Sequence, residues 1–170
     1  MFIEADEMKV VLYDYQLDEI AESNDDIIDE GIAAAITEVR AYFDAANARR
    51  ESADLSAQQY AAWKIYDVAA IFNATIVNNV DNRNKFVMRL VQRVAAYNIC
   101  ELANVDVLYT KVKDRYDGTI KTLEKIAGMG EYADSRIVLN DLPSPTQTPG
   151  ETPTPSTPFR MTSRTKFNHE

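Results

Sequence analysis

The chain has 170 residues, of which 46% are hydrophobic, and a formal net charge of −9. This length is sufficient for one domain with a substantial core, and the excess of carboxylates argues against tight binding to a nucleic-acid backbone, which requires clustered cations. A single cysteine, Cys100, cannot form an internal disulfide, and no apolar run approaches the roughly 20 residues of a membrane-spanning helix. The N-terminus does not resemble a signal peptide, so we expect a soluble protein made in a reducing compartment.

The prolines divide the chain. All six lie between Pro143 and Pro158, and residues 1–142 contain only four glycines. A proline-free, glycine-poor segment rich in Ala, Leu, Ile and Val is typical of helices. We therefore predict an all-α fold, a small helical bundle with a long extended C-terminal arm. Its expected parts are a helical body over residues 1–130, a linker over 131–158 and a docking segment over 159–170.

The N-terminal region is short-helical and acidic. Residues 4–12 and 15–22 are each predicted to form a short helix. Residues 1–31 contain eleven acidic residues and one basic residue, Lys9. This surplus indicates either a solvated face that aids solubility or a surface that repels DNA or binds a basic partner.

The next predicted helix has Asn24 or Asp25 as its N-cap and ends near Asn47. Its apolar residues recur at the three- and four-residue spacing of one helix face: Ile28, Ile32, Ala35, Ile36, Val39 and Phe43. The carboxylates of its first turns lack the alternating ligands and central glycine of a calcium loop. We expect no metal here.

Residues 48–79 are predicted to form a long polar crossover. Tyr60, Trp63 and Tyr66 recur at a spacing of three and can share one helix face. Such aromatic residues indicate either core packing or an interface between subunits, where Trp and Tyr are enriched. The following stretch mixes β-branched residues with asparagines, which predicts a loop or a short strand pair over residues 74–84.

Two long helices follow, and the first should be the most buried in the chain. We predict it over residues 81–103, with Asp81 as N-cap and with Phe86 and Leu102 in its apolar stripe. Its narrow polar face should hold Arg89, Gln92 and Arg93. A second helix over residues 106–127, capped by Gly128, should return along the first as a helical hairpin.

The C-terminal region differs in chemistry. Its Pro/Thr-rich part should run as an extended linker. In residues 159–167, Phe159, Met161 and Phe167 alternate with basic residues, which is the pattern of a strand with one apolar and one basic face. Because a helical body offers no sheet, this arm should add to the sheet of another protein; the alternative is a disordered solubilising tail. The partner-binding residues would be Phe159, Arg160, Met161, Arg164, Lys166 and Phe167.

The sequence provides no convincing catalytic constellation. Its only histidine, His169, lies in the arm, and Cys100 lies on the predicted buried helix. A nucleophile system or zinc site therefore lacks partners, and the glycines at 128 and 130 lack the preceding strand of a nucleotide-binding loop. We expect no enzyme activity, no cofactor and no metal.

Four stretches resemble one family of tailed-phage proteins. They are the opening FIEADEM, the AAITEVRAYFDA helix, the segment from AIFN through DNRNKFVMRLVQRVAAYNICELAN, and the closing RYDGTIKTLEKIAGMG. In this order they resemble the head–tail connector family related to the phage Mu neck proteins. The end, FRMTSRTKFNHE, is similar to that of Bacteroides-type phage and prophage members.

This resemblance implies a structural adaptor of the virion neck, made in the host bacterial cytoplasm. Such proteins assemble as a ring, usually dodecameric, beneath the portal protein, and extend the DNA channel without binding DNA specifically. The arm would then fasten each subunit to a neighbouring neck or portal protein, with no role for a membrane. A different reading of the residues is a soluble cytoplasmic binding module whose basic arm is a linear motif for a partner protein.

Overall fold

The computed structural model describes residues 2–21, 24–48, 65–78, 80–103, 109–133 and 135–144. Of these residues, 70% are helical, which confirms a mostly helical protein and adds a small two-stranded sheet that an all-α fold lacks. In chain order the elements are η1 (Ala5–Val10), α1 (Asp14–Ala21), α2 (Asp25–Ala48), α4 (Val68–Phe72), β1 (Ile76–Val77), β2 (Val80–Asp81), α5 (Lys85–Leu102), α6 (Tyr109–Ala127) and η2 (Gly130–Tyr132).

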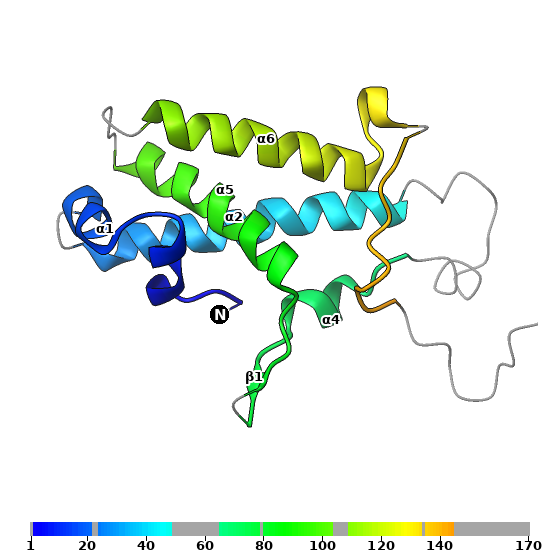
Figure 1. Ribbon diagram of the computed structural model, residues 1–170, viewed down its shortest axis with the longest axis horizontal. Coiled ribbons are helices and arrows are strands. Elements are labelled where there is room, and N and C mark those ends of the chain that lie inside the picture. Colours follow the sequence, from blue (N-terminus) through cyan, green and yellow to red (C-terminus); the bar gives the residue numbers. More distant parts are fainter. Residues whose placement is uncertain are drawn as a thin grey trace, which may run out of the picture.

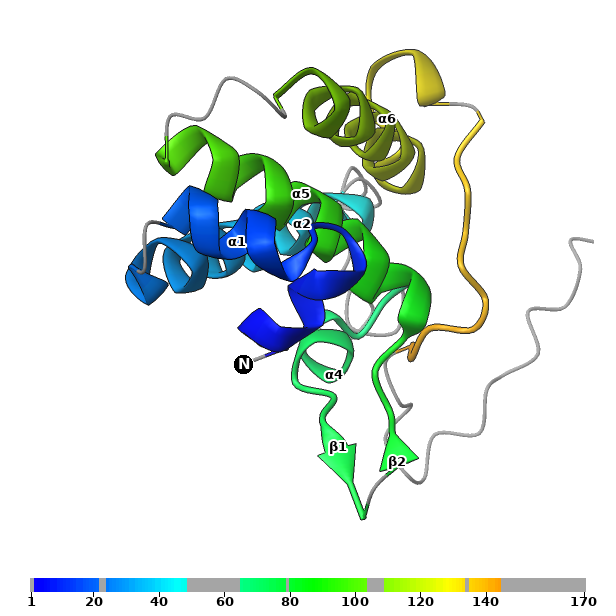
Figure 2. The same ribbon diagram turned by 60° about the vertical axis from the view of Figure 1, so that its left-hand side comes forward.

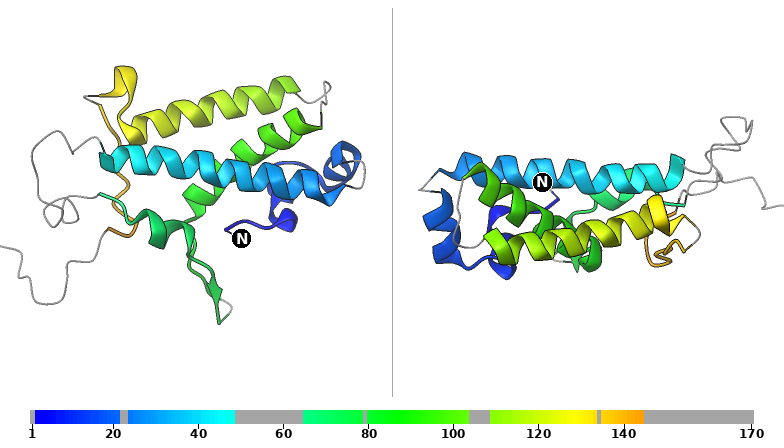
Figure 3. Two further views of the ribbon diagram at one scale, coloured as in Figure 1. Left: turned by 180° about the vertical axis from the view of Figure 1, so that it is seen from behind. Right: turned by 90° about the horizontal axis from the view of Figure 1, so that it is seen from above.

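Three long helices form the centre of the molecule. Helices α2 and α6 run in the same direction, and α5 crosses between them in the opposite sense (Figures 1 and 3). The fully buried side chains of α2 and α5 meet along this crossing: Ile32, Ala35, Val39, Val87, Val91, Val94 and Ile99. This contact is the main part of the hydrophobic core.

Helix α2 confirms the predicted helix over residues 25–47, with its start at Asp25. The side chain of Asn24 accepts a hydrogen bond from the Asp26 backbone N–H at 3.2 Å. Gly31 allows α2 to approach α5 closely, because an added Cβ would lie 2.5 Å from Cγ1 of Ile99. The absence of a side chain at this position therefore sets the distance between the two helices.

Helix α5 confirms the predicted central helix but begins four residues later. Its N-cap is Asn84, whose side chain accepts hydrogen bonds from the backbone N–H groups of Phe86 and Val87. Asp81 belongs to β2 instead, so its prediction as N-cap was wrong. The side-chain oxygen of Asn84, three residues after Asp81, provides the same capping chemistry as that of Asp.

The predicted faces of α5 also need correction at three positions. Phe86 and Leu102 are exposed, because they lie at the two ends of the helix, beyond the crossing with α2. Gln92 is buried rather than solvated, and its side-chain amide donates to the backbone carbonyl of Glu7 at 2.8 Å. The polar face expected for Gln92 is therefore partly covered by η1.

The two short N-terminal helices are confirmed as η1 and α1, with their ends shifted by one or two residues. Ile3 and Met8 are fully buried, and Leu12 and Leu17 are nearly so. These side chains attach the N-terminal region to α2 and α5, where Figure 2 shows η1 and α1 packed beside them.

Helix α6 confirms the second helix of the predicted hairpin and packs on both α2 and α5. The predicted turn of the hairpin lies in residues 104–108, outside the described part. At its end Gly128 has a φ of 67°, and the Met129 N–H donates to the carbonyl of Glu124 at 2.9 Å. This is the left-handed glycine cap that was predicted.

Residues 135–144 pack against the body, and we call them the C-terminal strap. The Ile137 N–H donates to the Lys125 carbonyl at 3.1 Å, the Leu139 N–H donates to the Tyr66 hydroxyl at 3.0 Å, and Leu142 is buried. The described body therefore extends beyond residue 130, where its end was expected. Apolar residues of the strap provide the burial that a Pro/Thr linker lacks.

Strands β1 and β2 form the predicted short strand pair. They are antiparallel, with Ile76 opposite Asp81 and Val77 opposite Val80. Asn78 in the turn has a φ of 51°, which Asn tolerates better than most residues. This β-hairpin projects from the helical body between α4 and α5 (Figures 1 and 2).

Candidate interaction surface

The β-hairpin exposes three large β-branched side chains. Ile76 is 57% exposed, Val77 51% and Val80 59%. In the pairing register, Val77 and Val80 lie on one face of the sheet, and Ile76 and Asp81 lie on the other. The hairpin thus carries apolar groups on both faces without packing them against the body.

A buried arginine fixes the root of the hairpin. The Arg83 guanidinium donates to both carboxylate oxygens of Asp81, at 2.8 and 3.0 Å, and to both of Glu7, at 2.8 and 2.6 Å. It also donates to the Phe2 carbonyl at 2.8 Å. Lys85 forms a further ion pair with Asp81. The side chain of Arg83 is only 5% exposed, so its charge is neutralised in a largely dry site.

These contacts shift the pKa values of Asp81, Glu7 and Arg83. Hydrogen bonds from Arg83, and then from Lys85, hold the pKa of Asp81 far below its usual range. The hydrogen bond from Arg83 also lowers the pKa of Glu7. The two carboxylates in turn raise the pKa of Arg83. The network is therefore fully charged near neutral pH, and it joins η1, β2 and the start of α5.

The C-terminal strap ends beside the same root. The Asp67 N–H, just before α4, donates to the Pro143 carbonyl at 2.8 Å. The side-chain amide of Asn84 donates to the carboxylate of Asp141 at 2.9 Å. Figure 1 shows the strap descending past the end of α2 to α4, which leads directly into β1. The last described residues of the strap thus lie near the root of the hairpin.

One end of the body concentrates exposed carboxylates. Among the described side chains of residues 2–30, the exposed acids are Glu4, Asp6, Glu19, Asp25, Asp26, Asp29 and Glu30. Glu7 is the exception, since Arg83 holds it in the root of the hairpin. Lys9 pairs with Asp6 at 3.0 Å, so the region's single cation is close to one of these acids. We call this region, formed by η1, α1 and the start of α2, the acidic end.

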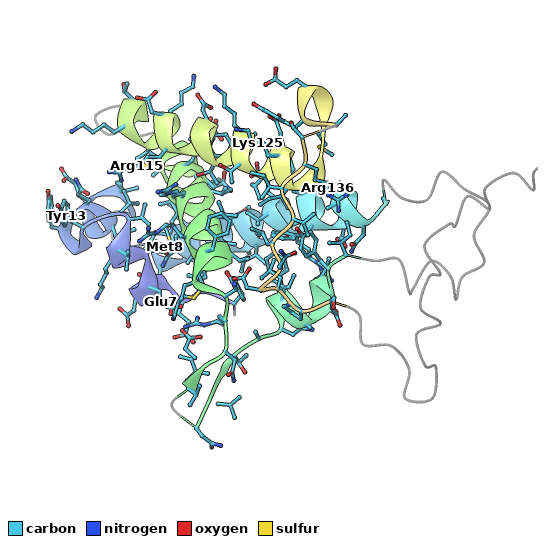
Figure 4. The ribbon with its side chains drawn as sticks, turned by 45° about the vertical axis from the view of Figure 1, so that its right-hand side comes forward. Glu7, Met8, Tyr13, Arg115, Lys125 and Arg136 are labelled. Atoms are coloured by element: carbon cyan, nitrogen blue, oxygen red, sulfur yellow. The ribbon has the colours of Figure 1, made fainter. Side chains whose placement is uncertain are left out.

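The acidic end also carries an exposed aromatic pair. The rings of Tyr13 and Tyr15 stack with centroids 5.8 Å apart, and both side chains are mostly exposed, as is Val10 nearby. Figure 4 shows Tyr13 at the extremity of the body. This pair was not singled out from the sequence, where no periodic pattern distinguishes these tyrosines from core residues.

Helix α6 has the opposite charge balance. It contains five basic and three acidic residues, and Arg115 and Lys125 lie along it in Figure 4. Lys125 lies 5.0 Å from the ring centroid of Tyr132, a cation–π distance. The molecule is therefore polarised, with carboxylates at one end and a mildly basic outer helix.

An open cleft of about 390 Å³ lies between α2 and α5, and its lining includes Glu30, Glu38 and Glu101. The hydroxyls of Tyr116 and Tyr97 donate to Glu38 and Glu101, at 2.8 and 2.9 Å, and the two rings stack 4.1 Å apart. Burial and then the bond to Glu38 raise the pKa of Tyr116. Glu38 and Glu101 therefore belong to a network of hydrogen bonds and stacked rings that ties α6 to α2 and α5.

Of the residues proposed from the sequence as binding sites, only Tyr66 lies in the described part of the chain. Tyr66 is 1% exposed and packs edge-on against Phe43, with ring centroids 5.2 Å apart. It belongs to the core, which corrects its alternative assignment to a subunit interface. The other assigned residues lie outside the described part of the chain: Tyr60, Trp63, Phe159, Arg160, Met161, Arg164, Lys166 and Phe167.

Sequence reasoning overlooked the exposure of the hairpin, although a signal for it was present. An Asn-Asn pair between β-branched residues, TIVNNV, is a turn flanked by strand-forming residues. What the pattern could not give is that the helices leave both faces of this hairpin uncovered. Exposure depends on packing of the whole body, which a six-residue pattern does not encode.

Within the described ranges, no group of three or more His, Cys, Asp and Glu side chains is arranged to hold a metal ion. Cys100 is buried, and burial raises the pKa of its thiol, which disfavours the reactive thiolate. None of the described helices is long and apolar enough to cross a membrane.

The comparisons with known proteins identify no relative: no family model, no curated protein and no solved structure matches this chain.

Proposed function

We propose that this chain is a structural subunit of a tailed-phage virion, a head–tail connector that forms a ring beneath the portal and extends the DNA channel. The proposal starts from the resemblance of four stretches to the connector family. The helical body supports it, because three of those stretches correspond to helices α2, α5 and α6, in the order that the resemblance requires.

The observation that carries the proposal is the acidic end. Seven exposed carboxylates gather there, with one lysine that is itself paired. DNA that must slide through a ring is best served by a wall that repels phosphates rather than one that binds them. The net charge of α6 is positive, so of these two surfaces the acidic end is the one that suits a channel wall.

The C-terminal arm would anchor each subunit to a neighbouring neck or portal protein by strand addition. The strap supports this role, because it attaches the chain to the body as far as Pro143 and so gives the arm a fixed origin. A weak arm contact repeated around a ring gives high avidity without a large interface in each subunit.

Image reconstruction of virions or of the isolated neck tests the ring. We expect a symmetric ring of this chain below the portal, with Asp25, Asp26 and Asp29 facing the channel. A neutral or basic channel wall would refute the electrostatic argument. Absence of the chain from particles would reject the connector function and favour the binding module, which should remain a monomer or dimer.

A proline substitution tests the arm. Met161→Pro removes a backbone N–H from the predicted strand and should abolish attachment of the chain to neck particles, while the far-UV circular dichroism of the body stays unchanged. The matched control is Thr154→Pro, in the Pro/Thr-rich stretch, where another proline is compatible with an extended chain. Equal attachment of the two variants would refute strand addition.

A further inference from the structure

The β-hairpin is an incomplete sheet. Within the described part of the chain, β1 and β2 pair only with each other, so the outer edge of each strand has no sheet partner. An isolated two-stranded hairpin is at best marginally stable in water, and a third strand or a covering helix is normally needed. Ile76, Val77 and Val80 are each more than half exposed, so the helices do not provide that cover.

The chain itself contains a segment with the matching pattern. In an extended chain over residues 159–167, one face would carry Phe159, Met161 and Phe167 with Ser163 and Thr165, and the other face would carry Arg160, Arg164 and Lys166 with Thr162. The body offers the hairpin as a sheet that such a strand can extend. The apolar face of this strand would continue the Val77–Val80 face. Its basic face would then lie on the side of Ile76 and Asp81.

The linker is long enough to reach a neighbouring copy. Residues 145–158 are 14 residues and, as an extended polyproline-type chain, span about 43 Å at ~3.1 Å per residue. The strap ends at Pro143, bonded to Asp67, only nine residues before Ile76. Nine residues cover at most about 32 Å even when fully extended, and α4 shortens that path. The linker is therefore longer than its own hairpin requires.

From these observations we propose that the β-hairpin of one copy binds the segment Phe159–Phe167 of a second copy as its third strand. The inference rests on the proposed function, because it identifies the neighbour that receives the arm as the next subunit of the ring. A head-to-tail exchange of this kind is a heterologous contact, in which every subunit donates one strand and receives one. Such contacts form a ring when the rotation between neighbouring subunits closes.

A peptide titration tests whether the hairpin accepts this strand. The probe is a peptide of residues 156–170, added to the full chain carrying Met161→Pro so that its own arm cannot compete. We expect the methyl NMR signals of Ile76, Val77 and Val80 to shift, whereas a peptide with the same proline should leave them unmoved. The double variant Val77→Lys, Val80→Lys should weaken binding at least about tenfold, and Val10→Lys, on an exposed site of η1, should not.

A mixed-copy crosslink tests whether the strand comes from a second copy. One isotopically labelled population carries Asn82→Cys, at an exposed residue at the base of the hairpin, and an unlabelled population carries Ser163→Cys in the arm. Cys100 is buried and stays in place. We expect a disulfide between labelled and unlabelled chains after mild oxidation, and its loss when the arm also carries Met161→Pro.

Two results would overturn the inference. One is the absence of any hairpin shift at millimolar peptide. The other is a doubly substituted chain, Asn82→Cys with Ser163→Cys, that crosslinks only within itself, which would assign the strand to its own hairpin. Both measurements use the purified chain, so their outcome is independent of whether the protein is found in the virion neck.

Discussion

Arg83 donates two hydrogen bonds to the carboxylate of Glu7, a residue 76 positions earlier in the chain, at 2.6 and 2.8 Å. This fork joins the N-terminal η1 to the strand that leads into α5. The same guanidinium holds Asp81, so one side chain sets the position of the N-terminal region and the direction in which the hairpin leaves the body.

Loss of the Glu7 charge should destabilise the protein. Glu7→Gln weakens a charge-assisted fork to a mostly buried arginine, and we expect a decrease of about 1–2 kcal/mol in the free energy of unfolding, allowing for the partial exposure of Glu7. Asp6→Asn is the control, because its pair with Lys9 is exposed and should contribute little. Urea unfolding followed by circular dichroism measures both, and equal midpoints would contradict the prediction.

Acid should weaken the same network. Glu7 and Asp81 have lowered pKa values in the folded state, against ordinary values of 4.5 and 3.8. The unfolded chain therefore binds more protons as the pH falls below about 5, and the stabilisation is lost progressively toward the folded-state pKa values. Arg83→Met removes the main cause of both shifts. Its free energy of unfolding should vary less between about pH 5 and pH 3 than that of Arg89→Met, in which an exposed arginine is replaced.

Asn47 should be a stability determinant at the end of α2. Its amide donates to the Tyr66 carbonyl at 2.9 Å, and its carbonyl accepts from the backbone N–H groups of Ile65 and Tyr66 at 2.9 and 3.1 Å. Asn47→Ala leaves these buried groups without partners and should cost about 2–3 kcal/mol. Asp44→Ala, one turn earlier, removes only an exposed ion pair 3.9 Å long and should change the free energy of unfolding by less than about 0.5 kcal/mol. A thermal melt of the two variants would refute the prediction if their midpoints coincided.

Two glycines on long helices should respond to alanine in opposite directions. At Gly31 a Cβ would lie 2.5 Å from Ile99 Cγ1 and 3.2 Å from its backbone nitrogen, so Gly31→Ala should destabilise by about 1–3 kcal/mol. At Gly118 an added Cβ meets nothing within 4 Å, so Gly118→Ala should stabilise α6 by about 0.5–1 kcal/mol. Chemical denaturation measures both, and a stabilised Gly31→Ala would show that the crossing of α2 and α5 is looser than described.

The helices could be predicted because their apolar residues recur with the period of a helix. Ile28, Ile32 and Val39 predicted the buried face of α2, and the start of that helix was predicted to within one residue. The beginning of α5 was missed because Asp81 and Asn84 are both good N-caps, and only the tertiary contact of Asp81 with Arg83 decides between them. That contact depends on a fold that local patterns do not specify.

The candidate surface was less predictable than the fold. The strand-forming residues around Asn78 indicated a loop or a strand pair, but their exposure follows from how the hairpin projects from the body between α4 and the start of α5 (Figure 1), not from their own sequence. The buried hydrogen bond of Gln92 to the Glu7 carbonyl was also missed, because the sequence does not indicate which backbone group a polar side chain will contact in the fold. The expectation that a helical body offers no sheet was wrong, because the body contains the two-stranded sheet of β1 and β2.

The C-terminal strap determines how the body would carry load. Tension applied to the chain beyond Ser144 meets the Pro143–Asp67 hydrogen bond first, then the buried Leu142, and only later the Leu139–Tyr66 and Ile137–Lys125 bonds. An applied force must thus break several separate hydrogen bonds and apolar contacts of the strap before it acts on the crossing of α2 and α5. Under tension, residues of the strap would therefore detach one after another while the packing of the long helices is preserved.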